Sequence, residues 1–270
     1  MEKITIHSWN ELQEQLFSDA YDPGLGRFRS PYVFRGAQNK KYKLRSALHR
    51  MGPNYREIEK HLLRNFRRYA HRDVVECDSV FHWMSVAQHH GLPTRMIDWT
   101  YSPFIAIHFA TAEINKFDRD GCIYMINFVA AKKFLPDDLR EILLEEGGDV
   151  FNVAQIAEKI NRLKDLKVLY PEIFPIFMEP PSLDDRMVNQ YALFSFMSDI
   201  DFTLDSWLKS HPELARKVII PKEIKWELRD KLDQANITER LLFPGLDGLS
   251  MWLKRQYSSG PQMIKKSPEA

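Results

Sequence analysis

The sequence predicts an α+β protein in which one mixed sheet packs against helices. Apolar residues make up 44% of the 270-residue chain and aromatic residues 12%, which is enough for a large core. Segments with strand alternation and segments with helical periodicity are intermixed, without the regular alternation of βαβ units and without an internal repeat. We expect one domain over residues 1–257 and a disordered tail at 258–270.

Charge and cysteine content exclude several classes of protein. The 38 Lys and Arg nearly balance the 37 Asp and Glu, so net charge favours neither wholesale nucleic-acid binding nor a membrane surface. Cys77 and Cys122 have no CxxC spacing, which argues against a zinc ribbon and against a disulfide framework. An apolar signal region and a run of eighteen apolar residues are both missing. We therefore expect a cytoplasmic protein without a membrane span.

The N-terminal elements follow from local signals. Residues 3–7 alternate as a short strand, and the S-x-x-E sequence at Ser8 is a capping box that opens a helix. Residues 21–30 are rich in Pro and Gly and are expected to form a loop. A strand follows at 31–35, and Gly36 is expected to end it.

Three helices and a buried strand are expected next. Residues 54–72 have a helical apolar stripe and an opposite basic face. The stripe comprises Ile58, Leu62, Phe66 and Tyr69. A second helix is predicted at 78–90, and Ser-Pro at 102–103 opens a third that runs to about residue 115. Residues 122–128 are typical of a buried strand.

The second half of the chain is predicted to begin with an insertion. Residues 130–185 are expected to form a helical insertion, and its Gly-Gly and Pro-rich segments are expected to be breaks between helices and not a flexible linker. Strands are expected at 193–197 and 217–220. Pro221 opens a helix that continues to about residue 235, which gives the domain C-terminal helical elements.

The tripeptide Phe34-Arg35-Gly36 is the first candidate site. Glycine at the end of a strand would let a backbone or ligand approach, and the arginine has five donors in a fork that suits phosphate or carboxylate. The alternative is an arginine in a structural ion pair beside a turn glycine.

Residues 86–110 are the second candidate, because many polar residues stand between two apolar helices. These are Gln88, His89, His90, Thr94, Arg95, Asp98, Trp99 and Ser102. Adjacent histidines lack the i, i+4 spacing of a metal site, so no metal is expected. The alternative is a structural network in which Arg95 pairs with Asp98. We predict instead that Arg35, Gln88, Thr94, Arg95 and Asp98 converge on one concave site.

These motifs, taken in order, resemble the FRG-domain family. The landmarks are FRG at 34–36, AQHHGLPTR through DWT at 87–100, the apolar segment 106–110, and residues 186–194 with Arg186 and Gln190. The resemblance covers about residues 30–200, and LFPGLDGL at 242–249 is similar to a recurrent C-terminal element of such proteins. Family members resemble bacterial stress, toxin or phage-defence components.

The resemblance extends more distantly to ADP-ribosyltransferases, which have a split sheet and an Arg that contacts NAD. This similarity implies an NAD site made by Phe34, Arg35, Gly36, Gln88, Thr94, Arg95, Trp99 and Ser102. Residues 94–102 followed by a helix are similar to the middle motif of those enzymes. The resemblance implies that Trp99 or Tyr101 stacks on the nicotinamide.

The sequence departs from the transferases at the motif that supplies the catalytic carboxylate. The third transferase motif places Glu two residues after Gln or Glu, whereas Gln190 is followed at that offset by Ala192. Glycosyl transfer passes through an oxocarbenium-like state that a carboxylate stabilises. Asp98 is the first candidate, ahead of Asp185 and Glu239. His89 and Gln190 complete the predicted catalytic set.

Three functions therefore remain open. The first is an ADP-ribosyltransferase-like toxin or phage-defence effector that uses NAD to modify RNA, DNA or protein, with an antitoxin or sensor protein as partner. The second is a non-catalytic sensor module in which Arg35 and Arg95 hold a nucleotide or an acidic segment. The third is a metal-free nuclease that uses His89 or His90 as general acid and base.

The basic face of the helix at 54–72 is a weaker candidate for nucleic-acid binding. Lys60, Arg64 and Arg67 share that face and could follow a phosphate backbone. The alternative is an ordinary solvated helix face.

Overall fold

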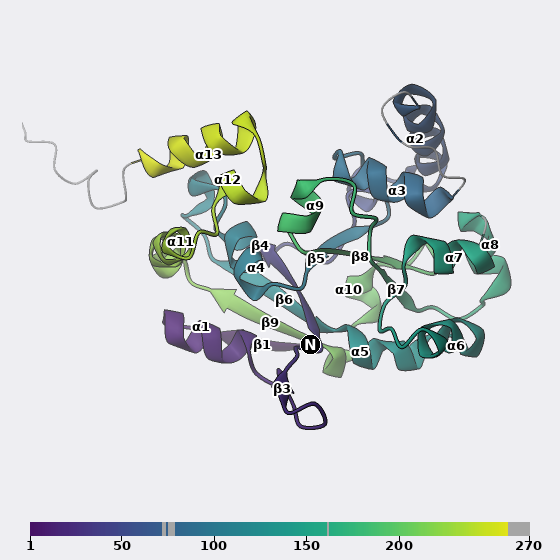
Figure 1. The fold of residues 1–270 in the computed structure, drawn as a ribbon, viewed down its shortest axis with the longest axis horizontal. Helices are drawn as coiled ribbons and strands as arrows, with labels where there is room; N and C mark the ends of the chain where they lie inside the picture. The colour runs from purple at the N-terminus through teal and green to yellow at the C-terminus, as the bar shows by residue number, and fades with distance from the viewer. Residues whose placement is uncertain (72–73, 75–78, 161, 259–270) are drawn as a thin grey trace, which may run out of the picture.

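The computed structural model describes residues 1–71, 74, 79–160 and 162–258. Its centre is a seven-stranded sheet in the order β1-β9-β6-β4-β5-β8-β7, with helices around it (Figure 1). The strands are β1 Glu2–Thr5, β4 Tyr32–Ala37, β5 Ile97–Thr100, β6 Gly121–Asn127, β7 Pro175–Met178, β8 Ala192–Met197 and β9 Ala215–Ile220. β1 and β9 are parallel, and the other neighbours are antiparallel. The predicted α+β class is confirmed.

The helices are distributed along the whole chain. They are α1 Trp9–Leu16, α2 Tyr55–Ala70, α3 Val80–His89, α4 Pro103–Ala110, α5 Phe128–Ala131, α6 Asp137–Glu145, α7 Val153–Lys159, α8 Leu163–Leu169, α9 Asp185–Asn189, α10 Leu204–Trp207, α11 Lys225–Gln234, α12 Glu239–Leu242 and α13 Leu246–Gln256. Within the described ranges, no helix combines the length and the apolar character that crossing a bilayer requires.

The core has two layers because successive strand residues point to opposite faces. On one face, Val33 and Trp99 pack with α5 and α10 in a cluster that spans β4, β5 and β8. The opposite face is divided. Phe34 and the residues of β4, β6 and β9 that point the same way pack there against α1, α4 and α11. Phe194 and Phe196 of β8 pack against α3 and α6–α8.

Most predicted elements lie on the expected segments, and the differences have local causes. α1 begins after Ser8, whose Oγ accepts from the Glu11 amide at 3.2 Å. The return hydrogen bond of the predicted capping box differs by one residue. The Glu11 carboxylate accepts from the His7 amide at 2.8 Å and not from the Ser8 amide. α4 ends at Ala110, five residues before the predicted end at Asn115.

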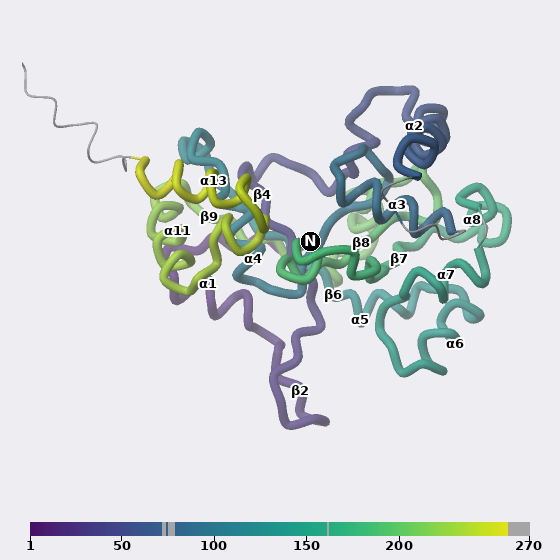
Figure 2. The backbone as a smooth tube through the Cα atoms, turned by 45° about the horizontal axis from the view of Figure 1, so that its top comes forward, coloured from purple at the N-terminus to yellow at the C-terminus, as the bar shows by residue number. Residues whose placement is uncertain are grey.

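Residues 21–30 are not only a loop. They contain the two-stranded hairpin of β2 (Tyr21–Asp22) and β3 (Arg27–Phe28), which extends away from the main body (Figure 2). Gly26 has φ of +61° between the two strands, the left-handed conformation that glycine adopts without strain. The turn residues were therefore recognised in the sequence, but the strands they join were not.

The Pro-rich segment 171–181 contains a strand of the main sheet. β7 begins at Pro175 and pairs with β8 as the last strand of the order. Proline lacks an amide donor and is tolerated at the first residue of an edge strand, so its presence does not prevent the pairing. Residues 130–185 thus contribute helices α6–α8 and one sheet edge. Cys77, the predicted helix start at Asp78 and residues 259–270 of the predicted tail lie outside the described residues.

Gly36 does not end its strand, contrary to the sequence prediction. β4 continues through it to Ala37, and Gly36 is opposite Ile123 of β6. A Cβ atom on Gly36 would lie 1.9 Å from the Ala106 carbonyl oxygen of α4. The glycine is required because α4 packs directly on the backbone of β4. The space on its Cβ side is filled by the helix, while Gly36 also borders the cavity described below.

α2 is the predicted amphipathic helix, but its apolar face is only partly covered. Tyr69, the last residue of the predicted stripe, is 74% exposed. The buried residue of this helix is Glu59, which is 5% exposed. α2 is therefore attached to the domain by a charged side chain as well as by its apolar stripe.

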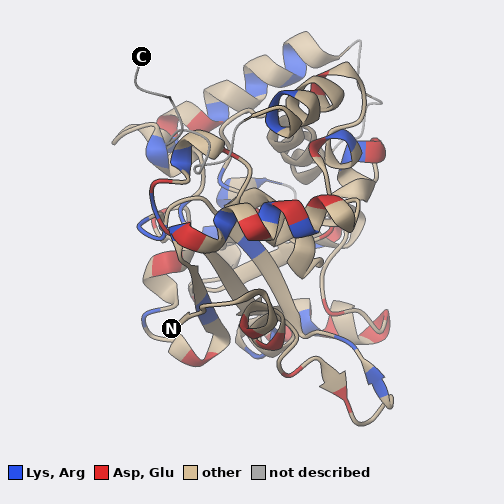
Figure 3. Ribbon diagram, turned by 90° about the vertical axis from the view of Figure 1, so that its left-hand side faces the viewer, with Lys and Arg blue, Asp and Glu red and all other residues tan. Residues whose placement is uncertain are grey.

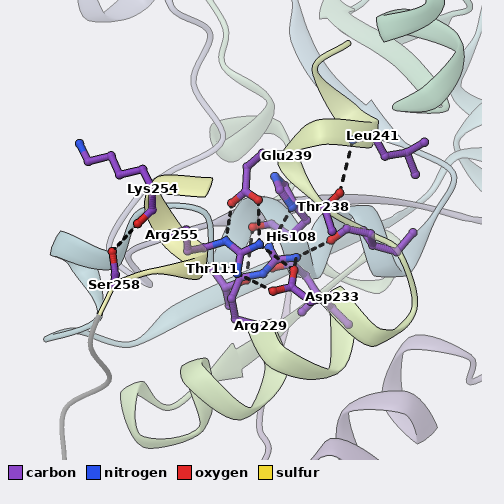
Figure 4. A network of polar contacts seen from close by, with 12 residues as sticks. His108, Thr111, Arg229, Asp233, Thr238, Glu239, Leu241, Lys254, Arg255 and Ser258 are labelled. Carbon is purple, nitrogen blue, oxygen red and sulfur yellow. Dashed lines mark hydrogen bonds and ion pairs between the residues drawn. The ribbon is translucent and has the colours of Figure 1, made fainter. Parts of the chain in front are cut away.

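A buried polar cluster connects the C-terminal helices to α4 (Figure 4). Arg255 of α13 donates from Nε to Glu239 Oε1 at 2.7 Å and from Nη1 to Asp233 Oδ2 at 2.6 Å. Arg229 of α11 donates from Nη1 to His108 Nδ1 at 2.8 Å. Because a guanidinium only donates, His108 Nδ1 must carry the lone pair, and the imidazole is held neutral.

We expect this neutral histidine to make the protein sensitive to acid. Burial first, and the charge of Arg229 second, lower the pKa of His108 to about 3. In the unfolded chain the pKa of this group is about 6.5, so the unfolded state binds more protons than the folded state between these two pKa values. Stability should fall as pH drops from about 6.5, by at most about 1.4 kcal/mol per pH unit. Urea unfolding of wild type and His108→Asn at pH 7, 6 and 5 should show a smaller pH dependence in the variant. Equal dependence in both proteins would contradict the assignment.

Candidate functional site

The site is built where β4 and β5 separate. β4 is paired along its whole length with β6, but its register with β5 is limited to Phe34 opposite Thr100. Beyond that pair the strands diverge, and a cavity of about 1190 Å³ opens between them. Its walls come from β4, the segment after β4, the end of α3, β5, α4 and α9. This volume accommodates a nucleotide-sized ligand.

A chain of hydrogen bonds crosses the split between the strands. Arg35 Nη1 donates to the Asp98 carbonyl oxygen at 2.6 Å and lies 3.3 Å from Asp98 Oδ2. Gln88 Nε2 donates to Asp98 Oδ1 at 2.7 Å, and Thr94 Oγ1 donates to Gln88 Oε1 at 2.6 Å. Thr94 is fully buried, and its hydrogen bond fixes the orientation of the Gln88 amide. The Asp98 side chain is 52% exposed. The structure thus brings Arg35, Gln88, Thr94 and Asp98 together.

Arg95 does not lie with the other four residues that were predicted to form one site. Its Nε donates to Glu59 Oε1 at 2.7 Å and its Nη2 to Oε2 at 2.5 Å, and both side chains are buried. Arg95 does not contribute to the wall of the cavity. The alternative pairing of Arg95 with Asp98 is also absent from the ion pairs of the described residues. Arg95 instead holds α2 against the domain, as a structural ion pair.

The aromatic residues proposed to stack on a nicotinamide are engaged elsewhere. Trp99 borders the cavity but is 3% exposed, and its Nε1 donates to Ser195 Oγ at 2.8 Å. Tyr101 Oη donates to Glu179 Oε1 at 2.9 Å. Ser102 is the N-cap of α4, where its Oγ accepts from the Ile105 amide at 3.4 Å. These three positions support the fold around the site.

His89 connects α3 to α9. Its Nε2 lies 2.6 Å from Asp184 Oδ2, and its carbonyl oxygen accepts from Arg186 Nη1 at 3.2 Å. Burial raises the pKa of Asp184, but hydrogen bonds from the Met187 amide and from His89 outweigh it, so the pKa is lowered. His89 is buried beside the cavity and already has a carboxylate partner, whereas His90 is exposed.

Gln190 fixes the C-terminal segment to the edge of the site. Its Nε2 donates to the Leu242 carbonyl oxygen at 2.9 Å, and the Arg186 guanidinium lies 5.1 Å from the ring centroid of Phe243. Asp185 is exposed and Glu239 is paired with Arg255, and neither contributes to the cavity wall. The structure therefore places both of these candidate carboxylates away from the cavity.

The carboxylates that do face the cavity are Asp98 and Glu113. Glu113 Oε2 lies 2.8 Å from Lys116 Nζ, and the hydrogen bond from this lysine lowers the pKa of Glu113. Asp98 is the one that stands in the split beside Arg35. Among the described residues, no group of three or more His, Cys, Asp or Glu is arranged to hold a metal ion.

The sequence interpretation missed four cations on one side of the cavity. Lys41, Lys43, Arg45 and Arg50, here called the cationic wall, are exposed and border the cavity. Within the described part of the chain, none of the four forms an ion pair with a carboxylate. Burial first, and the charge of Arg35 second, lower the pKa of Arg50. The sequence did contain a signal for this wall. Basic residues recur at every second position, 41, 43 and 45, around Leu44, which is buried in the core.

The basic face of α2 is separate from this site. Lys60, Arg64 and Arg67 do not border the cavity. Lys60 forms an ion pair with Glu57, and the Arg67 guanidinium lies 5.5 Å from the ring centroid of Trp83. Elsewhere, acidic and basic residues are interspersed along the surface helices (Figure 3). The four cations of the cationic wall thus stand at a concave site, whereas the cations of α2 do not.

The fold and the site define an α+β protein with a cationic cavity in a divided sheet. Residues 30–119 match the family model of the FRG domain, and the chain thus carries an FRG domain over about a third of its length. The match includes β4, the cationic wall, α3, β5 and α4, which supply most of the cavity. No curated protein and no solved structure matches the chain.

Proposed function

We propose that this protein is an ADP-ribosyltransferase-like effector of a toxin or phage-defence system, which takes NAD into the cavity and modifies a macromolecule. The observation that carries the proposal is the half-exposed Asp98 carboxylate, held by Arg35 and Gln88 inside a cavity with excess positive charge. NAD combines a diphosphate, which cations bind, with a glycosidic bond, whose cleavage a carboxylate assists.

The residues of the split suit the charges of this reaction. Within the described residues, Arg35 uses only Nη1, so Nε and Nη2 are available for a phosphate oxygen. The bond from the ribose to nicotinamide breaks, and nicotinamide leaves with the electron pair. Asp98 would stabilise the resulting oxocarbenium-like charge, as carboxylates do in glycoside hydrolysis. The acceptor then adds to the same ribose carbon and loses its proton.

A second candidate function is a sensor that binds a nucleotide without cleaving it. Two observations favour it. Both carboxylate oxygens of Asp98 already have partners, and Trp99 and Tyr101 are committed to other contacts. The same cavity would then report a bound nucleotide through Gln190 and the segment it holds at Leu242.

The test combines NAD affinity, measured by calorimetry, with detection of free nicotinamide and of added ADP-ribose mass on candidate macromolecules. Asp98→Asn should keep NAD affinity and lose turnover by about 100-fold or more, the range for removing a transition-state stabiliser. Arg35→Lys should weaken NAD binding by about 1 to 3 kcal/mol because the planar fork is lost. Glu113→Gln, which changes the other acid of the cavity, is the matched control and should affect turnover much less.

The outcomes separate the two candidates. Nicotinamide release that depends on Asp98 supports the transferase, and release without mass transfer indicates NAD hydrolysis. NAD binding without release supports the sensor. If the wild type binds neither NAD nor another nucleotide at millimolar concentration, both candidates fail.

A further inference from the structure

We propose that the cationic wall binds the phosphodiester backbone of a single-stranded nucleic acid, which is the macromolecule that receives ADP-ribose. This inference rests on the proposed function, because it names the acceptor. It also replaces the basic face of α2 as the expected place of nucleic-acid contact.

The backbone of the wall is fixed by side chains from the sheet and from α11. Lys225 Nζ donates to the Gln38 carbonyl oxygen at 2.9 Å, and Lys217 Nζ donates to that of Lys40 at 2.6 Å. Tyr124 Oη donates to the carbonyl oxygen of Tyr42. The carbonyl groups of alternate residues are thus held toward the protein. The backbone of this segment is already ordered, so ligand binding costs little conformational entropy.

The charge of the wall exceeds that of the acids at the cavity, which among the described residues are Asp98 and Glu113. In the described chain, Lys41, Lys43, Arg45 and Arg50 lack carboxylate partners within ion-pair distance. Lys217 and Lys225 are buried behind the segment and add positive charge. An NAD diphosphate beside Arg35 would neutralise only one end of this array. A polyanion with regularly spaced phosphates would neutralise the rest.

An aromatic side chain stands within the array. Tyr42 is 46% exposed and borders the cavity between Lys41 and Lys43. Cations along a groove together with an exposed aromatic ring are the usual components of single-strand binding, in which bases stack on the ring. An acidic peptide would use the cations but would gain less from the tyrosine, so this pairing favours nucleic acid.

The position of Asp98 favours a single strand over a duplex. The carboxylate lies in the split between β4 and β5, inside a concave site. Enzymes that act on a base must receive it outside the helical stack. A flexible strand along the wall can place one base in the cavity directly, whereas a duplex must first unpair and extrude that base.

The experiment measures binding of fluorescent single-stranded DNA and RNA 12-mers by anisotropy across a salt series, without NAD. The test variant is Lys41→Gln/Lys43→Gln/Arg45→Gln, and the matched control is Lys60→Gln/Arg64→Gln/Arg67→Gln on α2. Loss of three phosphate contacts should reduce the slope of log affinity against log salt by about 2. We expect about a tenfold or greater loss of affinity at low salt for the wall variant and less than about a twofold loss for the control. Tyr42→Leu should weaken binding without changing the slope.

Four results would overturn the proposal. The first two are absence of binding by the wild type at low salt and an equal loss in the wall and α2 variants. The other two are competition by an acidic peptide as effective as that by an oligonucleotide, and duplex binding at least as tight as single-strand binding. Because NAD is left out, failure here is distinct from failure of NAD binding, which calorimetry tests without an oligonucleotide.

Discussion

Gly36→Ala is expected to destabilise the protein by about 3 kcal/mol or more, or to prevent folding, because overpacking at a rigid contact is costly. The added Cβ would lie 1.9 Å from the Ala106 carbonyl oxygen and 2.6 Å from the Ala110 amide nitrogen. Both are backbone atoms of α4, so relief requires the helix to move away from β4. Urea unfolding monitored by circular dichroism measures the change.

Gly148→Ala is the matched control for this substitution. Its nearest neighbour would be the Val150 carbonyl oxygen at 3.5 Å, an ordinary contact. Its stability should change by less than about 0.5 kcal/mol, as at most surface positions. Wild-type stability of Gly36→Ala would mean that α4 does not pack on β4 as closely as described.

Arg255→Met is expected to cost about 3 to 5 kcal/mol, because removal of one partner leaves buried charge uncompensated. Arg255 donates to both Glu239 and Asp233, and Glu239 is 5% exposed. Lys254→Met, at the adjacent exposed position of α13, should change stability by less than about 0.5 kcal/mol. Equilibrium unfolding in urea compares the two variants.

A second substitution tests the mechanism of that loss. Arg255→Met/Glu239→Gln removes the uncompensated carboxylate as well, so the double variant should recover part of the lost stability. If the two losses are simply additive, the cost of Arg255→Met arises from lost packing and not from the buried charge.

The accuracy of the sequence prediction depended on how local each feature is. Strands and helices such as β6 and α1 follow from periodicity and caps within their own segments, and these lie where expected. β7 was missed because its pairing with β8 involves residues about twenty positions away and its first residue is proline. Local propensity does not contain that information.

The candidate site likewise has features that the local sequence predicts and features that depend on distant residues. Arg35, Gln88 and Asp98 were identified together because each is a polar residue beside an apolar element. The partner of each cation was not predictable from type alone. Arg95 has a buried carboxylate on α2, whereas Arg50 has none among the described residues, although both are arginines near the same strands. Only the tertiary arrangement distinguishes a structural arginine from one available to a ligand.

The edges of the sheet bear on whether molecules of this protein associate with one another. Unpaired strand edges can recruit another chain and start aggregation, and short, charged or covered edges oppose this. At one edge, Phe151 covers β7 by donating its amide to the Phe177 carbonyl oxygen at 3.0 Å and accepting from the Glu179 amide at 2.8 Å. At the other edge, β1 has four residues and exposes Glu2 and Lys3. Both edges therefore disfavour strand exchange and extension of the sheet from one molecule to the next.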